Sequence, residues 1–193
     1  MFLSIKILMI GFTAFAFNAN AHLNNALLNN AERNTDGAPN AFSQTEADSA
    51  APHTIKDLEF LVGDWVGPGV SYNDKGEVSE YYDTEFVRFD LDENLLLINA
   101  RGEQDGRTTY QLHTVIYFDQ ERGQYVYTPY RGERAPRPFF CDLEAQKLIC
   151  LTEAKTYRLV FQRLDDGRWN EYGEGLTDGI WVKRFETKLS PRL

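Results

Sequence analysis

The chain has 193 residues, of which 42% are hydrophobic and 25% charged, and its formal net charge is −9 at pH 7. A negative charge of this size repels nucleic acid and anionic lipid, so neither is an expected partner. The sequence also lacks a Gly-x-Ser-x-Gly motif, a phosphate-binding loop and the Cys/His spacing of a zinc site. Without these motifs, the sequence points to no catalytic residue and no bound metal.

Residues 1–21 have the layout of a secretory signal peptide. Lys6 is followed by an apolar stretch over residues 7–17, and Ala19 and Ala21 frame a cleavage site of the A-x-A kind. The apolar stretch is about half as long as the roughly 20 residues that a membrane-spanning helix needs. Cleavage would leave a net charge of −10 and no membrane segment. The signal-peptide layout predicts a secreted protein, which in a bacterium would be periplasmic.

Residues 22–53 are rich in Asn and Ala and poor in large apolar side chains. Such a segment cannot bury enough surface to offset the entropy of ordering it, so we predict a flexible tether. The remaining residues 54–193 have the length of one domain with a single core. Thr54, followed three residues later by Asp57, resembles a helix capping box and predicts a short helix that ends before Gly63.

Beyond the helix, alternating, aromatic and β-branched runs are separated by turn residues. The predicted strands cover residues 64–73, 79–89, 94–103, 107–118, 124–130, 135–141, 147–152, 155–164, 168–175 and 179–189. Short strands with tight turns and no helix between them favour antiparallel pairing, and closure into a barrel removes exposed strand edges. We predict an all-β fold, an antiparallel up-and-down β-barrel of about ten strands behind a short helix. An immunoglobulin-like sandwich is the main alternative.

Cys141 and Cys150 are expected to form a disulfide. A two-residue turn at Ala145 and Gln146 places the two cysteines directly opposite each other, within reach of an S–S bond. An even number of cysteines in a secreted chain favours the same pairing. The role of the disulfide would be structural, and the alternative is two reduced cysteines in the core.

The stretch LEFLVGDWVGPG, residues 58–69, places Trp65 among glycines directly after the predicted helix. A short helix, a Gly-x-Trp motif and an antiparallel barrel together resemble the calycin superfamily, which includes the lipocalins and the fatty-acid-binding proteins. Residues 58–69 are similar to the beginning of small bacterial lipocalin-like domains and of nitrobindin, a ten-stranded haem barrel. The resemblance covers residues 54–189. It implies that Trp65 points inward and plugs the end of the barrel that the helix covers.

In calycins a basic residue from the last strand often packs on this tryptophan. In the last predicted strand, GIWVKRFETKL, the more apolar alternate set contains Lys183 and Phe185, and we expect it to face inward. The two residues then lie where fatty-acid-binding proteins have an Arg-x-Tyr pair that holds the ligand carboxylate, although Phe185 lacks the hydroxyl. The alternative is that Lys183 or Arg184 simply packs near Trp65.

His113 is the one histidine within the predicted barrel, where it lies either on the surface or in the cavity. Nitrobindin-like barrels take their axial histidine from near the C-terminal strands, and no histidine follows position 113, so a haem cofactor is not expected. Most strand carboxylates alternate with aromatic residues, as on a solvated outer face; they are Glu80, Asp83, Glu85, Glu103, Glu171, Glu174 and Glu186.

The segment YVYTPYRGERAPRPFF, residues 125–140, contains three prolines that interrupt regular strand pairing. It could lie at the barrel mouth, with Tyr127 and Phe139 as aromatic lining and Arg131 donating hydrogen bonds to an anionic head group. The alternative is a proline-stiffened hairpin whose arginines face water.

The main functional expectation, implied by the resemblance, is a secreted, monomeric, lipocalin-like barrel that binds a small apolar or amphipathic molecule in its lumen. The candidate ligand-binding residues are Trp65, His113, Tyr127, Arg131, Phe139, Lys183 and Phe185. One alternative is a filled barrel that acts as a structural or protein-interaction module. Another is an isomerase or cyclase of the kind that some calycin-like barrels host, with a polar pair around His113 inside the cavity.

Overall fold

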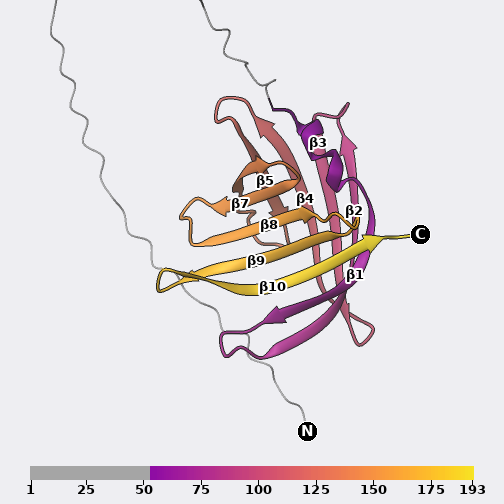
Figure 1. The fold of residues 1–193 in the computed structure, drawn as a ribbon, viewed down its shortest axis with the longest axis vertical. Helices are drawn as coiled ribbons and strands as arrows, with labels where there is room; N and C mark the ends of the chain where they lie inside the picture. The colour runs from indigo at the N-terminus through magenta and orange to yellow at the C-terminus, as the bar shows by residue number, and fades with distance from the viewer. Residues whose placement is uncertain (1–52) are drawn as a thin grey trace, which may run out of the picture. The chain divides into compact units, whose positions relative to one another are not determined.

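The computed structural model describes residues 53–193 (Figure 1), so the predicted signal peptide and all but the last residue of the predicted tether lie outside the described residues. The helix η1 is a 3-10 helix, Ile55–Leu61. The strands are β1 Gly63–Tyr72, β2 Val78–Asp90, β3 Leu95–Gln104, β4 Arg107–Asp119, β5 Gln124–Tyr130, β6 Phe139–Glu144, β7 Lys147–Thr152, β8 Tyr157–Arg163, β9 Trp169–Thr177 and β10 Ile180–Pro191. In this described part of the chain, no helix has the length and apolar character needed to cross a membrane.

The strands close into a barrel in which each strand pairs antiparallel with the next and β10 pairs with β1. The predicted all-β up-and-down barrel behind a short helix is therefore confirmed. Asp-Gly pairs form two of the tight turns, Asp105 with Gly106 and Asp178 with Gly179. All four residues have positive φ, between 50° and 79°. Two-residue hairpin turns need this left-handed conformation, which Asp and Gly tolerate best.

The helix is fixed to the barrel through Asp57. The backbone N–H of Thr54 donates to the Asp57 carboxylate over 3.1 Å, as the predicted capping box requires. The Tyr125 hydroxyl of β5 donates to the same carboxylate over 3.0 Å. Because Leu58 and Leu61 are also buried, one face of η1 belongs to the barrel core.

The sixth strand differs from its predicted bounds. It was expected at 135–141, whereas β6 runs Phe139–Glu144. Pro136 and Pro138 have no backbone N–H to donate to a neighbouring strand, so pairing begins only after them. Before that point, Arg131 and Arg134 form a single isolated bridge.

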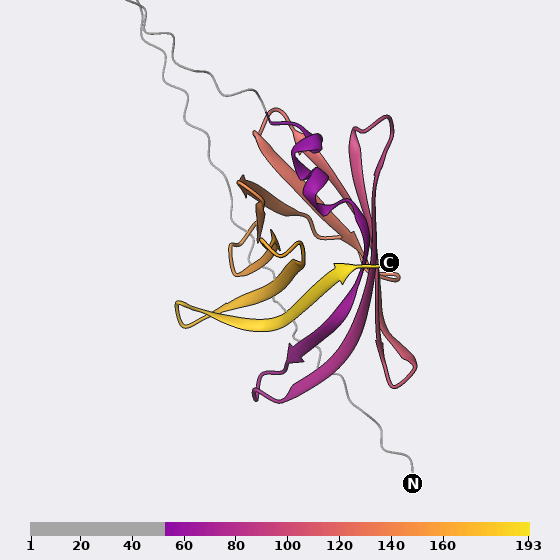
Figure 2. The same ribbon diagram turned by 45° about the vertical axis from the view of Figure 1, so that its right-hand side comes forward.

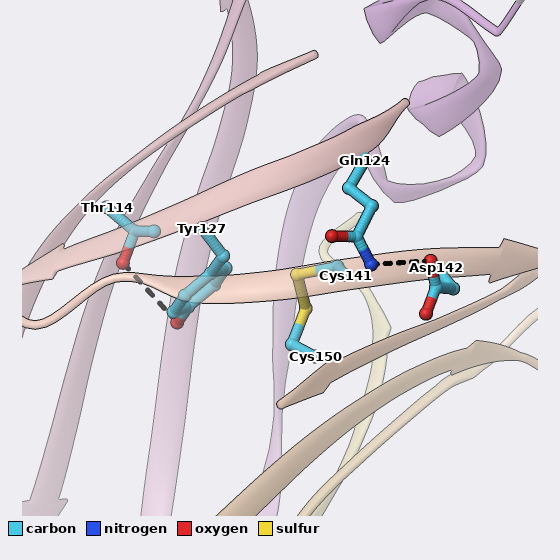
Figure 3. Close-up of a disulfide and its surroundings, with 6 residues drawn as sticks. All are labelled: Thr114, Gln124, Tyr127, Cys141, Asp142 and Cys150. Atoms are coloured by element: carbon cyan, nitrogen blue, oxygen red, sulfur yellow. Dashed lines mark hydrogen bonds between the residues drawn. A yellow bond between two sulfur atoms is a disulfide. The ribbon is translucent and has the colours of Figure 1, made fainter. Parts of the chain in front are cut away.

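The predicted disulfide joins Cys141 of β6 to Cys150 of β7 (Figure 3). The cysteines lie directly opposite each other, and the adjacent pair Asp142 and Ile149 matches the predicted register. Both cysteines are fully buried, whereas Asp142 is exposed and accepts a hydrogen bond from Gln124 over 2.9 Å. The disulfide therefore lies on the inner side of the barrel wall.

The apolar core fills one end of the lumen. In both Figure 1 and Figure 2, η1 lies at one end of the barrel beside β3 and β4, and the β1–β2 hairpin lies at the opposite end. The core cluster contains residues of η1 and inward side chains of all ten strands, among them Trp65, Val87, Leu96, Ile116, Phe161, Trp169 and Leu189.

Trp65 lies at this packed end and is 2% exposed. Its Nε1 donates to the backbone carbonyl of Leu61 over 2.9 Å, which ties the first strand to the helix. Its ring meets the Trp169 ring edge-on, with 5.8 Å between centroids. The guanidinium of Arg163 lies 4.5 Å from the Trp65 ring centroid. The cation on this tryptophan thus comes from β8, not from the last strand as the resemblance implied.

Candidate functional site

The other part of the lumen holds a cavity of about 430 Å³, within the size range of small-molecule sites. Its apolar lining consists of Ile98, Ala100, Leu112 and Phe185, and its phenolic lining of Tyr81, Tyr110, Tyr127 and Tyr157. The outermost lining residues include Ser79, Gln104, Thr109 and Arg131, all of which are exposed. The cavity therefore opens to solvent near the β1–β2 hairpin, away from the helix.

A carboxyl cluster, formed by Asp83, Glu85 and Glu171, lies inside the barrel. Asp83 and Glu85 come from β2 and are 2% and 3% exposed, and Glu171 comes from β9 and is 9% exposed. Strands β2 and β9 are separated by β1 and β10, so these side chains meet across the lumen. Glu85 and Glu171 share a hydrogen bond and both line the cavity. The Tyr110 hydroxyl donates to Asp83 beside them.

Burial raises the pKa of all three carboxyl groups. Desolvation is the largest cause in each case. It raises the pKa of Asp83 to about 6, against the donated Tyr110 hydrogen bond, which favours the ionised form. Repulsion from neighbouring acids adds to burial and raises the pKa of Glu85 well above its ordinary value. Burial and this repulsion therefore favour the protonated form of Glu85, which can donate its proton to Glu171.

Gly69 on the inner face of β1 makes room for the Tyr81 ring, which lines the cavity. A Cβ at Gly69 of β1 would lie 2.3 Å from the Tyr81 ring, so the ring fits only because glycine stands there. The Tyr81 hydroxyl is 2.6 Å from the Thr187 hydroxyl on β10, which fixes its direction. The Tyr81 ring in turn meets the Tyr110 ring edge-on, with 5.7 Å between centroids. Gly69 thus lets Tyr81 lie over the first strand and form part of the cavity wall.

Two arginines lie at the open end of the cavity. Arg131 follows β5 and is exposed. Arg184 lies at a β-bulge of β10, between Lys183 and Phe185, where the pairing with β9 shifts by one residue. Its guanidinium pairs with Asp74 over 2.9 Å at the rim.

Because of this bulge, Lys183 lies on the opposite face of the strand from the one expected. The alternation predicted that Lys183 and Phe185 share the inner face, but the extra residue reverses the alternation between them. Phe185 faces the cavity, whereas Lys183 lies on the outer face, where its ammonium contacts Glu186 over 2.9 Å and the Tyr172 ring at 4.9 Å. Arg184 takes the inward position that was predicted for Lys183.

His113 also lies outside the lumen. Its strand neighbours Leu112 and Thr114 line the cavity, so alternation directs His113 outward. It is exposed, and its Nδ1 is 2.7 Å from the side-chain oxygen of Asn99 on the outer face. The polar pair that an isomerase would need is therefore not built around His113.

Of the other sequence-predicted site residues, Tyr127, Arg131 and Phe185 line the cavity. Phe139 is buried next to them, with its ring edge-on to Tyr127 at 5.8 Å between centroids. Trp65 belongs to the packed end and is not among the cavity-lining residues of the described chain.

Most strand carboxylates were expected on the outer face, and for Asp83, Glu85 and Glu171 this expectation was wrong, because all three are buried. The outward residues of β2 are the exposed Tyr82 and Phe86. The sequence at the end of β2 contains a pattern that predicts the inward direction of two of these carboxylates. Continued alternation puts Asp83 and Glu85 on one face with Val87, which the core must bury.

This arrangement supplies acid–base and hydrogen-bonding chemistry in an aromatic cavity. Glu85 and Glu171 form a hydrogen-bonded carboxyl pair that can give up or take up a proton, and four phenol groups surround the pair. Among residues 53–193, no group of three or more His, Cys, Asp or Glu is placed to hold a metal ion.

The comparisons with known proteins identify a fold and no family. No model of a protein family matches the chain, and no curated protein matches it. The crystal structure of Rv2717c from M. tuberculosis superposes with a TM-score of 0.55 at 9% identity, covering 72% of this chain and 97% of that one. A second match is the crystal structure of a protein of unknown function from the DUF3598 family of Nostoc punctiforme, at 8% identity over 72% of this chain and 99% of that one. Its TM-score of 0.23 is too low to establish a shared fold. At this identity, the likeness to Rv2717c shows that the two chains share a barrel fold.

Proposed function

We propose that this protein is an exported, lipocalin-like barrel that binds a small amphipathic molecule in its lumen. The cavity of about 430 Å³ carries the proposal, because it combines apolar walls with polar groups at both its depth and its rim. The ligand's apolar body would lie against Ile98, Leu112 and Phe185, and Arg131 and Arg184 at the rim could receive an anionic group. The volume disfavours the alternative of a filled, purely structural barrel.

Export is part of the proposal and rests on two features. Residues 1–21 have the layout of a signal peptide. The buried disulfide between Cys141 and Cys150 suits an oxidising compartment such as the periplasm.

The carboxyl cluster supports acid–base catalysis as a second candidate function. Two hydrogen-bonded carboxyl groups with raised pKa values, Glu85 and Glu171, form an arrangement in a cavity that can transfer protons to and from a bound molecule, as an isomerase or cyclase requires. Conversion of the bound molecule, rather than its stoichiometric retention, would favour this candidate.

Filling the cavity tests the binding function. We expect Leu112→Trp to weaken binding of the fluorescent amphiphile anilinonaphthalene sulfonate at least about tenfold, because the indole occupies space that the probe needs. The matched control is Gln111→Trp, which places the same side chain on the exposed outer face one residue away. Fluorescence titration of the two variants and the parent gives the comparison, and far-UV circular dichroism checks that each variant is folded. Equal affinity in all three would overturn the proposal that the lumen is the binding site.

A further inference from the structure

We propose that the carboxyl cluster is the recognition site for a protonated amine, so that the lumen binds aryl- or alkylammonium compounds. This inference rests on the proposed function of the cavity and specifies the chemistry of its ligand.

The first observation is a charge imbalance inside the barrel. Three carboxyl groups lie together in the lumen, and within residues 53–193 no Lys or Arg forms an ion pair with any of them. The two arginines that line the cavity are Arg131 and Arg184, and Arg184 is paired with Asp74 at the rim. Carboxyl groups crowded in a low dielectric repel one another when ionised, and a cation placed among them would relieve this repulsion.

The second observation is unused hydrogen-bonding capacity facing the cavity. Among residues 53–193, the only hydrogen bond of the Glu85 and Glu171 side chains is the one that they share. Tyr127 is 4% exposed, and its hydroxyl accepts a hydrogen bond from Thr114 over 3.4 Å while no acceptor for its own proton is found among these residues. An ammonium group brings three donors and a positive charge, which match free carboxyl oxygens.

The third observation is the aromatic wall around the cluster. The rings of Tyr81, Tyr110, Tyr127, Tyr157 and Phe185 line the cavity. Aromatic faces carry partial negative charge and attract ammonium groups, more strongly when water is excluded. The same rings offer apolar surface to the carbon skeleton of the ligand, so an amine with an aryl or alkyl body satisfies both parts of the site.

The test compares ligands that differ only in the charge of one end. Calorimetric titration with phenethylamine, phenethyl alcohol and hydrocinnamate uses one ring with a cationic, neutral or anionic end, and octylamine, octanol and octanoate repeat the comparison with an alkyl chain. In each series we expect the amine to bind at least about tenfold more tightly than the alcohol, because charge-assisted hydrogen bonds are stronger than neutral ones.

A matched pair of variants locates the ammonium group. Glu171→Gln should weaken amine binding at least about tenfold and leave alcohol binding within about threefold, because the amide keeps the shape and removes the charge. Glu174→Gln, on the outer face of the same strand, removes a carboxylate that pairs with Arg158 and should leave both affinities unchanged.

Proton release provides a readout that a merely structural role would not give. Protonated carboxyls that receive an ammonium group ionise, so amine binding should release protons and tighten from pH 6 to pH 8. The release is measured by titration in two buffers of different ionisation enthalpy. The other titratable or charged groups that face the Glu85–Glu171 pair are Asp83, Tyr81, Tyr110, Tyr127, Tyr157 and Arg184.

The outcomes separate this inference from the proposed function. Alcohols or carboxylates that bind as tightly as the amines would overturn the ammonium site and leave the binding cavity in place. Failure of both series, together with anilinonaphthalene sulfonate binding that Leu112→Trp does not alter, would overturn both proposals.

Discussion

Trp65→Ala is expected to lower the free energy of unfolding by about 4 kcal/mol, the cost of removing a large buried aromatic side chain. Trp65 is 2% exposed and joins three parts of the packed end, through Leu61 of the helix, Trp169 of β9 and Arg163 of β8. Its removal leaves a cavity between these elements and breaks the hydrogen bond that ties β1 to η1.

Trp181 provides the control for this variant. It lies partly exposed on β10, where the Arg158 guanidinium is 4.5 Å from its ring centroid. Trp181→Ala should cost about 1 kcal/mol or less, because its ring removes little apolar area from water. Urea denaturation of both variants, followed by circular dichroism, gives the two values. Equal losses would contradict the assignment of Trp65 to the closed end of the barrel.

The free energy of unfolding should fall as the pH rises from about 4 to about 8. In the folded protein, burial raises the pKa of Glu171 from 4.5 to about 8, whereas in the unfolded chain this group titrates near its ordinary value. Between these two values the folded state holds more protons than the unfolded state, so the stability present below the unfolded pKa is lost as the pH rises. At about 1.4 kcal/mol per pKa unit, the loss is on the order of 3 to 5 kcal/mol.

Glu171→Gln should flatten this pH dependence, because the amide cannot ionise and the proton difference at this position disappears. Glu174→Gln serves as the control, since Glu174 lies on the outer face and pairs with Arg158. Denaturant midpoints measured for the three proteins at pH 5, 6, 7 and 8 give the slopes. A parent protein whose stability rises over this range would contradict the buried, protonated state of the carboxyl cluster.

The barrel could be predicted from the sequence because strand alternation and turn chemistry are local. The Asp-Gly turns mark the ends of four strands, and the spacing of Cys141 and Cys150 sets the register of one hairpin. Both signals lie within a few residues of the feature that they determine. Pro136 and Pro138 shortened the sixth strand at its start, which the same local rules explain.

The candidate site could be predicted only in part because its geometry depends on distant strands. Glu85 and Glu171 are 86 positions apart in sequence and meet across the lumen, so no local pattern pairs them. The direction of Lys183 was wrong because a single bulge residue, Arg184, reverses the alternation. Tyr127 and Arg131 were placed at the cavity because the prolines beside them indicated an irregular, open part of the wall. Phe185 was placed there because the alternation of the last strand put it on the more apolar, inner face.

The central claim is that the lumen carries a small molecule, and native mass spectrometry of the protein isolated from its own organism tests it most directly. We expect a stoichiometric added mass, below that of a peptide, which is released on denaturation and is absent from Leu112→Trp but present in Gln111→Trp. A nitrogen-containing composition with a basic amine would agree with the ammonium site. A bare protein mass in the parent after gentle isolation would contradict the claim and favour a barrel that acts through its outer surface.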